Sequence, residues 1–558
     1  MRDAIAWSHD LLDADERRLF RRLAIFSGGW TVRGAEAICA GDDLPATAIL
    51  DRMEALLEHH LLRAEINGGA ETRVAMFETT HEYALEQLTA SGERGAIERQ
   101  HAAYYLARAE EAERQLTGGE QRVWFTWLEA ENDNLRAALT WTRDTGEIDM
   151  GLRLAGALAR FWYIRGYQRE GGAWLADLLA RGMDSSPYAR AKALYGAALL
   201  AYVRTDFAHA LDLLRTSVAL WREIGDQRGL ADALTCTGAT LADMGEYARA
   251  TVAHEESLAL QRASDNQSGI SASLNNLANI ARHQGDRSRA IQLYDDALAI
   301  RRTLGDTATS AIILQNIGQL LREMGEYRRA EMALAESIEM HGGTGDQRQV
   351  ALAMSSLGTS ARDQGDYARA RAYCDRCLAL FRELGSKADI ARTLIDRARI
   401  AHETGDDARA VMLAEESLAL ARATHHQRNT AHALLCTADI TRRRGMPEMA
   451  RARYIEGLQS FHAVGDPFGM TEAVERLGLL ATDPGGAVRL LGFCAAMRAR
   501  MSTPIPPVER DEHARADARL RAALGADAFA AAWAAGAALT LEDAIAEAFE
   551  GRMGSNEQ

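Results

Sequence analysis

The chain has 558 residues, a formal net charge of −15 at pH 7 and a hydrophobic content of 47%. This length exceeds what one compact core usually supports, so we expect several domains or a repeating array. The acidic balance argues against a protein that mainly coats nucleic acid, because contacts to phosphates need a basic surface. The N-terminus lacks the pattern of a signal peptide and no apolar run is long enough for a membrane span. The sequence therefore predicts a cytoplasmic location without membrane contact.

Residues 1–92 predict a winged helix domain. Apolar residues at helical spacing indicate two helices at the start, and Asp13 stands where an N-cap is expected. Further helices are predicted from Val32 to Cys39 and from about Ala46 to His60. Two strand-like stretches, LLRAEI and TRVAMF, then flank a turn at Asn67–Gly69, which is a hairpin signal.

Charge decides how the predicted winged helix is interpreted. In a winged helix that reads DNA, the helix before the wing enters the major groove. That helix carries Asp51, Glu54 and Glu58 against a single Arg52, so its surface would be repelled by phosphates. We therefore expect the domain to pack against protein and direct nucleic-acid contact to be absent, with DNA reading kept as the alternative.

Residues 93–186 predict helices that do not follow the register of the later repeats. The stretch WFTWLEAENDNLRAALTW places Trp124, Trp127 and Trp141 at spacings that cover one buried face. A degenerate helix pair is expected to break at Gly166. These aromatic side chains are interpreted as the core that seals the first repeat of an array.

From residue 187 to residue 506 a 40-residue pattern recurs about eight times. Within one copy, helix A buries Leu274, Leu277 and Ala278, Gly285 supplies the positive φ of a helix end, and helix B follows. The pattern resembles the tetratricopeptide repeat, although the repeat is longer than the standard length of about 34 residues. The predicted fold is mostly α, with the winged helix followed by a right-handed superhelix of paired helices. The recurring glycines are Gly245, Gly285, Gly325, Gly365, Gly405, Gly445 and Gly485.

The concave face of a tetratricopeptide array is lined by helix A, so its polar positions are the candidate ligand-binding groove. Amides there could hydrogen-bond the backbone of an extended peptide, and arginines could hold carboxylates or phosphates. The alternative is a solvated face whose arginines pair with Glu323, Asp363 and Glu403. If the arginines bind a partner, reversing Arg282 and Arg322 should abolish capture with little change in the melting temperature. The candidates form four layers: Asn275, Gln315 and Ser355; Asn276, Asn316, Ser356 and Asp396; Asn279, Gln319, Thr359 and Arg399; Arg282, Arg322, Arg362, His402 and Arg442.

The remaining motifs predict packing rather than chemistry. Cys374 and Cys377 fall on an apolar face of a second helix, so core packing is favoured over a redox or metal pair. Residues 507–550 are expected to form a helical cap that begins one helix near Thr540. P-loop, nucleophile-elbow and zinc-protease motifs do not occur in the sequence. We therefore expect no catalysis, no cofactor and no metal.

Several segments resemble one bacterial family more closely than the repeat alone does. They are AIAWSHDLLDADERRLFRRLAIFSGGWTV, FETTHEYALEQLTASGE, WLEAENDNLRAALTW and RFWYIRGYQREGGAWL, and they are similar to the predicted ATPases of the STAND class. That class includes many LuxR-type and SARP-type transcriptional regulators. The segment from LLGFCAAMRARMSTPIPPVER onward is similar to their C-terminal end.

The resemblance implies a winged helix preceded by an NTPase domain and followed by a tetratricopeptide sensor. This chain lacks the NTPase domain and the LuxR-type helix-turn-helix, so neither ATP hydrolysis nor direct DNA binding is carried over. What the resemblance implies is a sensor arm. Its repeats would bind a protein, a peptide or an inducer, and its winged helix would pack against an NTPase domain.

Overall fold

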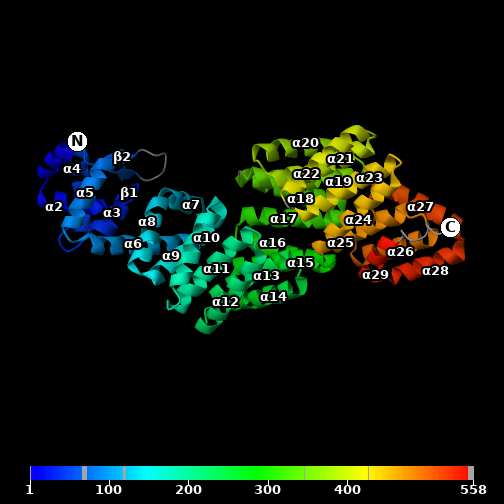
Figure 1. Ribbon diagram of the computed structural model, residues 1–558, viewed down its shortest axis with the longest axis horizontal. Helices are drawn as coiled ribbons and strands as arrows, with labels where there is room; N and C mark the ends of the chain where they lie inside the picture. Colours follow the sequence, from blue (N-terminus) through cyan, green and yellow to red (C-terminus); the bar gives the residue numbers. More distant parts are fainter. Residues whose placement is uncertain (1, 66–71, 117–120, 345, 425, 551–558) are drawn as a thin grey trace. The chain divides into compact units, whose positions relative to one another are not determined.

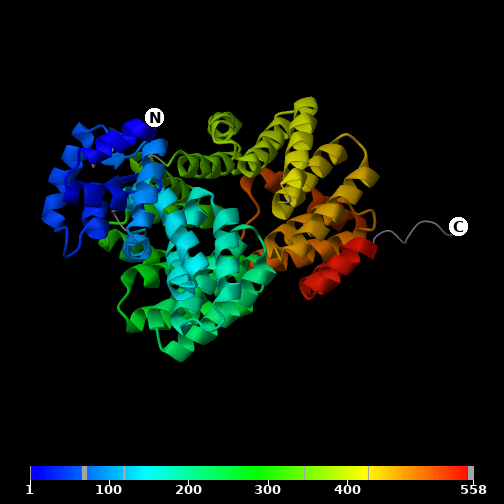
Figure 2. The ribbon, with the colours of Figure 1, turned by 60° about the vertical axis from the view of Figure 1, so that its left-hand side comes forward.

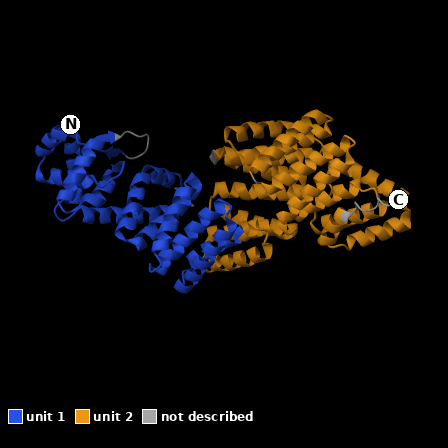
Figure 3. Ribbon diagram, in the orientation of Figure 1, with its two compact units in different colours: residues 1–240 blue, residues 241–558 orange. Residues whose placement is uncertain are grey.

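The computed structural model describes residues 2–65, 72–116, 121–344, 346–424 and 426–550. These residues divide into two compact units, residues 1–240 (unit 1) and 241–558 (unit 2), as Figure 3 shows. Nearly all of the described chain is helical, as predicted, and Figure 1 labels the elements. Among the described helices, none is both long and apolar enough to cross a bilayer.

Unit 1 begins with the predicted winged helix. Asp13 caps α2 in a capping box. Its carboxylate accepts a hydrogen bond from the backbone N–H of Glu16 at 2.8 Å, and the carboxylate of Glu16 accepts one from the backbone N–H of Asp13 at 2.8 Å. The elements of this domain are α1 (Arg2–Asp10), α2 (Ala14–Leu23), β1 (Gly29–Thr31), α3 (Val32–Cys39), η1 (Ala46–Ala48), α4 (Ile49–Glu58), β2 (Arg63–Glu65), β3 (Arg73–Ala75) and α5 (Glu78–Ala90).

The sheet contains one strand more than the predicted hairpin. Strands β2 and β3 pair antiparallel as expected, and β1 pairs with the other edge of β3, with Trp30 opposite Val74. Strand β1 has three residues, as β2 and β3 do, but no hairpin turn links it to its partner β3 in the sequence. The predicted turn at Asn67–Gly69 lies outside the described residues.

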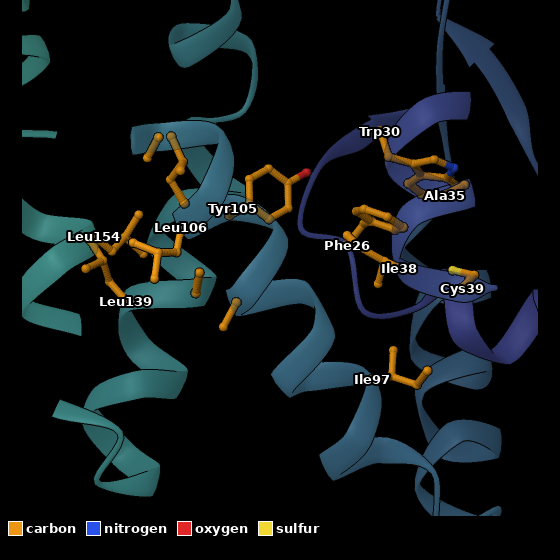
Figure 4. Close-up of a cluster of buried hydrophobic side chains, with 14 of the residues drawn as sticks. Phe26, Trp30, Ala35, Ile38, Cys39, Ile97, Tyr105, Leu106, Leu139 and Leu154 are labelled. Carbon is orange, nitrogen blue, oxygen red and sulfur yellow. The ribbon is translucent and has the colours of Figure 1, made fainter. Parts of the chain in front are cut away.

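The helices that follow continue the core of the winged helix. Figure 4 shows Phe26 and Ile38 of that domain on one side of α6, and Leu139 and Leu154 of later helices on its other side. Gly166 has a φ of +86° between α9 and α10, which is the predicted break. These helices are α6 (Arg94–Gln115), α7 (Gln121–Ala130), α8 (Asn132–Thr145), α9 (Ile148–Arg165), α10 (Gln168–Arg181), α11 (Pro187–Val203), α12 (Phe207–Ile224) and α13 (Gln227–Asp243), which runs across the boundary of the units.

A buried polar network joins the winged helix to α6 and α8. The carboxylate of Glu131 forms an ion pair with Arg73 of β3 and accepts from the hydroxyl of Tyr105 at 2.7 Å. Asn134 donates to the carbonyl of Gly29 at 3.0 Å and to Glu131 at 2.7 Å. Two of these residues belong to the ENDNLRAAL motif, so that motif has a structural role at this junction.

Unit 2 consists of stacked helical hairpins, which follow one another from green to orange in Figures 1 and 2. The first helix of each hairpin is the predicted helix A, and α15, α17, α19, α21 and α23 each contain 17 residues and begin 40 residues apart. The hairpin helices are α14 (Tyr247–Ala263), α15 (Gln267–His283), α16 (Arg287–Thr303), α17 (Thr307–Glu323), α18 (Tyr327–Thr344), α19 (Gln347–Asp363), α20 (Tyr367–Glu383), α21 (Lys387–Glu403), α22 (Asp407–Ala423), α23 (Gln427–Arg443), α24 (Pro447–Ala463), α25 (Pro467–Leu480) and α26 (Pro484–Arg500).

The small residues of the repeat have the predicted roles. Gly285 has a φ of +85° between α15 and α16, and Asp286 then caps α16 by accepting from the N–H of Arg289 at 3.0 Å. A Cβ at Gly318 would lie 2.6 Å from Leu334 Cγ, so glycine permits the close approach of α17 and α18. Cys374 and Cys377 are fully buried, in agreement with the packing interpretation.

The end of the chain packs on the last hairpin. A Cβ at Gly536 would lie 2.0 Å from the carbonyl oxygen of Arg489, so α28 crosses α26 with almost no space between the backbones. Thr540 begins the last helix as predicted, accepting from the N–H of Asp543 at 3.1 Å. The elements are η2 (Pro507–Glu509), α27 (Arg510–Leu524), α28 (Ala526–Ala537) and α29 (Leu541–Glu550).

Candidate ligand pocket in unit 2

A cavity of about 420 Å³ lies inside unit 2, where the A helices of successive repeats face one another. Its wall is completed by α26 and by the segment between α26 and α27. The lining residues are Arg282, His283, Arg287, Gln319, Arg322, Glu323, Ser355, Ser356, Thr359, Arg362, Asp363, Arg392, Ile395, Asp396, Arg399, Arg428, His432, Asp466, Pro467, Phe468, Glu472, Arg498, Met501, Pro506 and Glu509.

Nine of the sixteen residues in the four predicted layers line this cavity: Arg282, Gln319, Arg322, Ser355, Ser356, Thr359, Arg362, Asp396 and Arg399. The structure thus brings the C-terminal parts of the predicted A-helix faces together.

The other predicted residues lie away from the cavity wall. The Nδ2 of Asn316 donates to Asn275 at 3.2 Å, and Asn279 accepts from the hydroxyl of Tyr294. Gln315 is buried, and Asn276 is half-buried. At the ends of their helices, His402 is 3.1 Å from Asp407 and Arg442 is 2.7 Å from Glu512.

The predicted arginines form ion pairs between successive repeats. Arg282 pairs with Glu323, and Arg322 pairs with Asp363 at 2.7 Å, so each bond joins residues 41 positions apart. Arg362 contacts Asp363 at 2.7 Å and Asp396 at 2.9 Å. These pairs match the alternative interpretation for Glu323 and Asp363, whereas Glu403 lies 3.8 Å from Arg443. Reversal of Arg282 and Arg322 should therefore destabilise unit 2, contrary to the expectation from the sequence.

Arginines keep two carboxylates of the cavity, Glu323 and Glu472, ionised despite their burial. Burial raises the pKa of Glu323, but Arg282 and Arg287 outweigh it and hold the pKa at about 2. Burial likewise opposes ionisation of Glu472, and Arg476 and Arg399 keep its pKa well below the usual range. The cavity is thus a charged interior in which these two carboxylates and the arginines beside them depend on one another.

A segment that the sequence did not place in the groove covers part of the cavity. Arg287 donates to the carbonyl of Met501 at 2.6 Å. Pro504 lies against Gly325, where a Cβ would be 2.9 Å from Pro504 Cγ. Glu509 follows in η2 and lies 3.7 Å from Arg476. The prolines of this segment indicate extended backbone, but nothing in its composition indicates which surface it covers.

Replacing Gly325 by alanine should test the contact with Pro504. Gly325 and Gly405 have φ values of +77° and +82°, but a Cβ at Gly405 would meet nothing within 4 Å. Both substitutions strain the backbone, and Gly325→Ala should lower the free energy of unfolding by about 1–3 kcal/mol more because it also forces Pro504 aside. Thermal unfolding of the two variants measures the difference. Equal losses would mean that residues 501–509 do not rest on this turn.

Two histidines of the cavity should make unit 2 sensitive to acid. Burial lowers the pKa of both His283 and His432 to about 4, although Glu472 raises that of His432. A histidine whose pKa is lower in the folded state than in the unfolded state favours folding most at a pH above its unfolded pKa of about 6.5. This contribution to the free energy of unfolding is lost as the pH falls toward the folded pKa of about 4. The loss per histidine should reach about 2 kcal/mol at pH 5.

The measurement is the melting temperature at pH 7.5 and pH 5 for the wild type and for His432→Gln. The variant should lose less stability on acidification than the wild type does. An identical loss in both proteins would show that His432 is protonated in the folded state at pH 5.

Two family models match the chain. A winged helix-turn-helix domain matches residues 12–89, and a tetratricopeptide repeat matches residues 269–341 and 349–423. The first model covers most of the winged helix domain. The second covers four hairpins of unit 2, which carry six of the arginines that line the cavity.

Curated relatives match part of the chain. A Mycobacterium tuberculosis protein named "Putative HTH-type transcriptional regulator Rv0890c" is 36% identical over 248 residues, 43% of this chain and 28% of that protein. A second M. tuberculosis protein, of uncharacterised function, is 37% identical over 94 residues, 17% of this chain and 24% of that protein. The matches thus span about a quarter of each relative, 28% of the first and 24% of the second.

A solved structure shares the fold. It is a Signal Transduction ATPase with Numerous Domains (STAND) protein with a tetratricopeptide repeat sensor, from Pyrococcus horikoshii. The TM-score is 0.54 at 13% identity, covering 81% of this chain and 64% of that one. The chain therefore contains a winged helix domain and tetratricopeptide repeats, and it shares the fold of this STAND protein.

Proposed function

We propose that this chain is the sensor arm of a bacterial transcriptional or signalling regulator and that its repeats bind a ligand in the cavity of unit 2. The observation that carries the proposal is the cavity itself, which the A helices of successive repeats surround. Its volume of about 420 Å³ falls in the range of small-molecule sites. The ligand would be an inducer, a peptide or part of a partner protein, and the chain would act without catalysis.

The domain arrangement supports a role in regulation. One relative is named as an HTH-type transcriptional regulator, and the STAND structure is described as having a tetratricopeptide repeat sensor. In this proposal the winged helix packs against an NTPase domain, which suits its acidic α4. Ligand binding in the repeats would then change how the arm contacts that domain.

A substitution that fills the cavity tests the proposal. Thr359 lines the cavity, so Thr359→Trp should occupy the space of a ligand. Met412 is 68% exposed on α22, so Met412→Trp adds the same side chain outside the cavity. The melting temperature of the full chain is measured against a set of peptides and metabolites, since a ligand at 100 times its Kd stabilises by about 2.7 kcal/mol. The gain in melting temperature should vanish in Thr359→Trp and persist in Met412→Trp. If both variants keep the gain, the ligand binds outside the cavity.

A second candidate function is DNA reading by the winged helix. It is favoured by the match of residues 12–89 to a winged helix-turn-helix domain. The surface of α4 argues against it, because Asp51, Glu54 and Glu58 are exposed and Arg52 is held by Asp13 at 2.9 Å. DNA titration of the full chain separates the two functions.

A further inference from the structure

The cavity of unit 2 holds more positive than negative side chains. Eight arginines line it against six carboxylates. Seven of the arginines have a carboxylate within 3.4 Å. The eighth arginine of the cavity wall, Arg392, forms no ion pair with any residue that the structure describes.

Arg392 has buried side-chain nitrogen atoms that form no hydrogen bond. Its Nε and Nη2 are buried and have no hydrogen-bond partner. Arg392 is half-buried, and leaving two buried N–H groups of a charged guanidinium without partners is unfavourable, because they have lost their hydration and gained no hydrogen bond in return. Such a group at a cavity wall indicates a site that an anion completes.

Two further polar groups without partners line the same cavity. Arg392, Asp396 and Arg399 share one face of α21, since their spacing of four and seven residues is one and two helical turns. The Nε of Arg399 is also buried without a partner. His432 occupies the position of Arg392 in the next repeat, on α23, and its Nδ1 is unpartnered as well. Helices α21 and α23 pack against each other, and Arg392, Arg399 and His432 all line the cavity.

We propose that the cavity binds a small metabolite carrying carboxylate or phosphate groups, with Arg392 as its main contact and Arg399 and His432 as further contacts. Guanidinium groups recognise both kinds of oxyanion through paired N–H donors. The size of the cavity and its cover by residues 501–509 favour a small molecule over a peptide laid along the repeats. This inference rests on the proposed function and specifies the ligand class of the same site.

Calorimetric titration of the full chain in a low-chloride buffer tests the inference. The probes are pyrophosphate, citrate and a short polyglutamate peptide, and the variants are Arg392→Gln and Arg409→Gln. Arg409 is exposed on the outer helix α22, so its replacement removes the same charge outside the cavity. One of the two small anions should bind at one site per chain, and comparison of the two distinguishes a phosphate from a carboxylate ligand. Arg392→Gln should weaken binding by about tenfold or more, while Arg409→Gln should leave it unchanged.

Folding of Arg392→Gln is measured in the same buffer without anion. Because the structure gives Arg392 no ion pair to lose, its melting temperature should equal or exceed that of the wild type. A large fall would show a structural partner and overturn the inference. It is also overturned if neither small anion binds, or if Arg409→Gln weakens binding equally. Binding of another ligand that Thr359→Trp abolishes would leave the proposed function standing without the anion.

Discussion

Replacement of Glu323 by glutamine should lower the free energy of unfolding of unit 2 by about 3–5 kcal/mol. Glu323 pairs with both Arg282 and Arg287, and the side chain of Arg287 is only 2% exposed. The glutamine has nearly the same shape, so it leaves two buried guanidinium groups without their counter-charge. Removing one partner of a buried ion pair costs far more than the pair contributes, because the remaining charge stays desolvated.

Glu326→Gln is the matched control for Glu323→Gln. Glu326 pairs with Arg329, but the two side chains are 38% and 62% exposed, so the expected change is below about 1 kcal/mol. Urea titration gives both values, and hydrogen exchange assigns the loss to α15–α17. If the two variants lose equal stability, water reaches Arg287 and the charged interior described above does not exist.

Glu131→Gln should have a comparable effect in unit 1, also about 3–5 kcal/mol. Its carboxylate neutralises Arg73, whose side chain is 11% exposed, and accepts hydrogen bonds from Tyr105 and Asn134. Glutamine retains one acceptor oxygen but not the charge. The contact between β3 and α8 would weaken first, because Arg73 belongs to the winged helix and Glu131 precedes α8.

Glu129→Gln provides the comparison two residues away. Glu129 pairs with Arg165 at 3.0 Å in an exposed position, so a change below about 1 kcal/mol is expected. Hydrogen exchange of β3 and α6 should accelerate in Glu131→Gln and stay unchanged in Glu129→Gln. Unchanged exchange in both variants would mean that apolar contacts alone hold the winged helix on α6 and α8.

The repeats were predictable because their signals are local and periodic. A glycine such as Gly285 marks a helix end by its own conformation, and 40-residue spacing fixes the hairpins without knowledge of their packing. The winged helix was recognised by its helices and by β2 and β3. Strand β1 was missed because its pairing with β3 is not local, so no hairpin turn marks it as one marks β2 and β3.

The candidate site was predicted only in part because its contacts are not local. The pairing of Arg282 with Glu323 joins two repeats, and only the 41-residue spacing hints at it in the sequence. The placement of residues 501–509 depends on how the array curves, which a repeat pattern does not specify. Arg392 had a usable signal, since Ile312 and Leu352 occupy its position in earlier repeats. An arginine that replaces an apolar residue at one position of a repeat points to a local function.

DNA titration of the full chain tests most directly whether the repeats, rather than the winged helix, recognise the ligand of this protein. Fluorescence anisotropy with random-sequence duplexes at about 50 mM salt favours any electrostatic binding. We predict no saturable binding by the wild type, and a gain of weak, salt-sensitive binding in Asp51→Lys with Glu54→Lys, since both acids are exposed on α4. Tight binding by the wild type that falls steeply with salt would contradict the account and assign recognition to the winged helix.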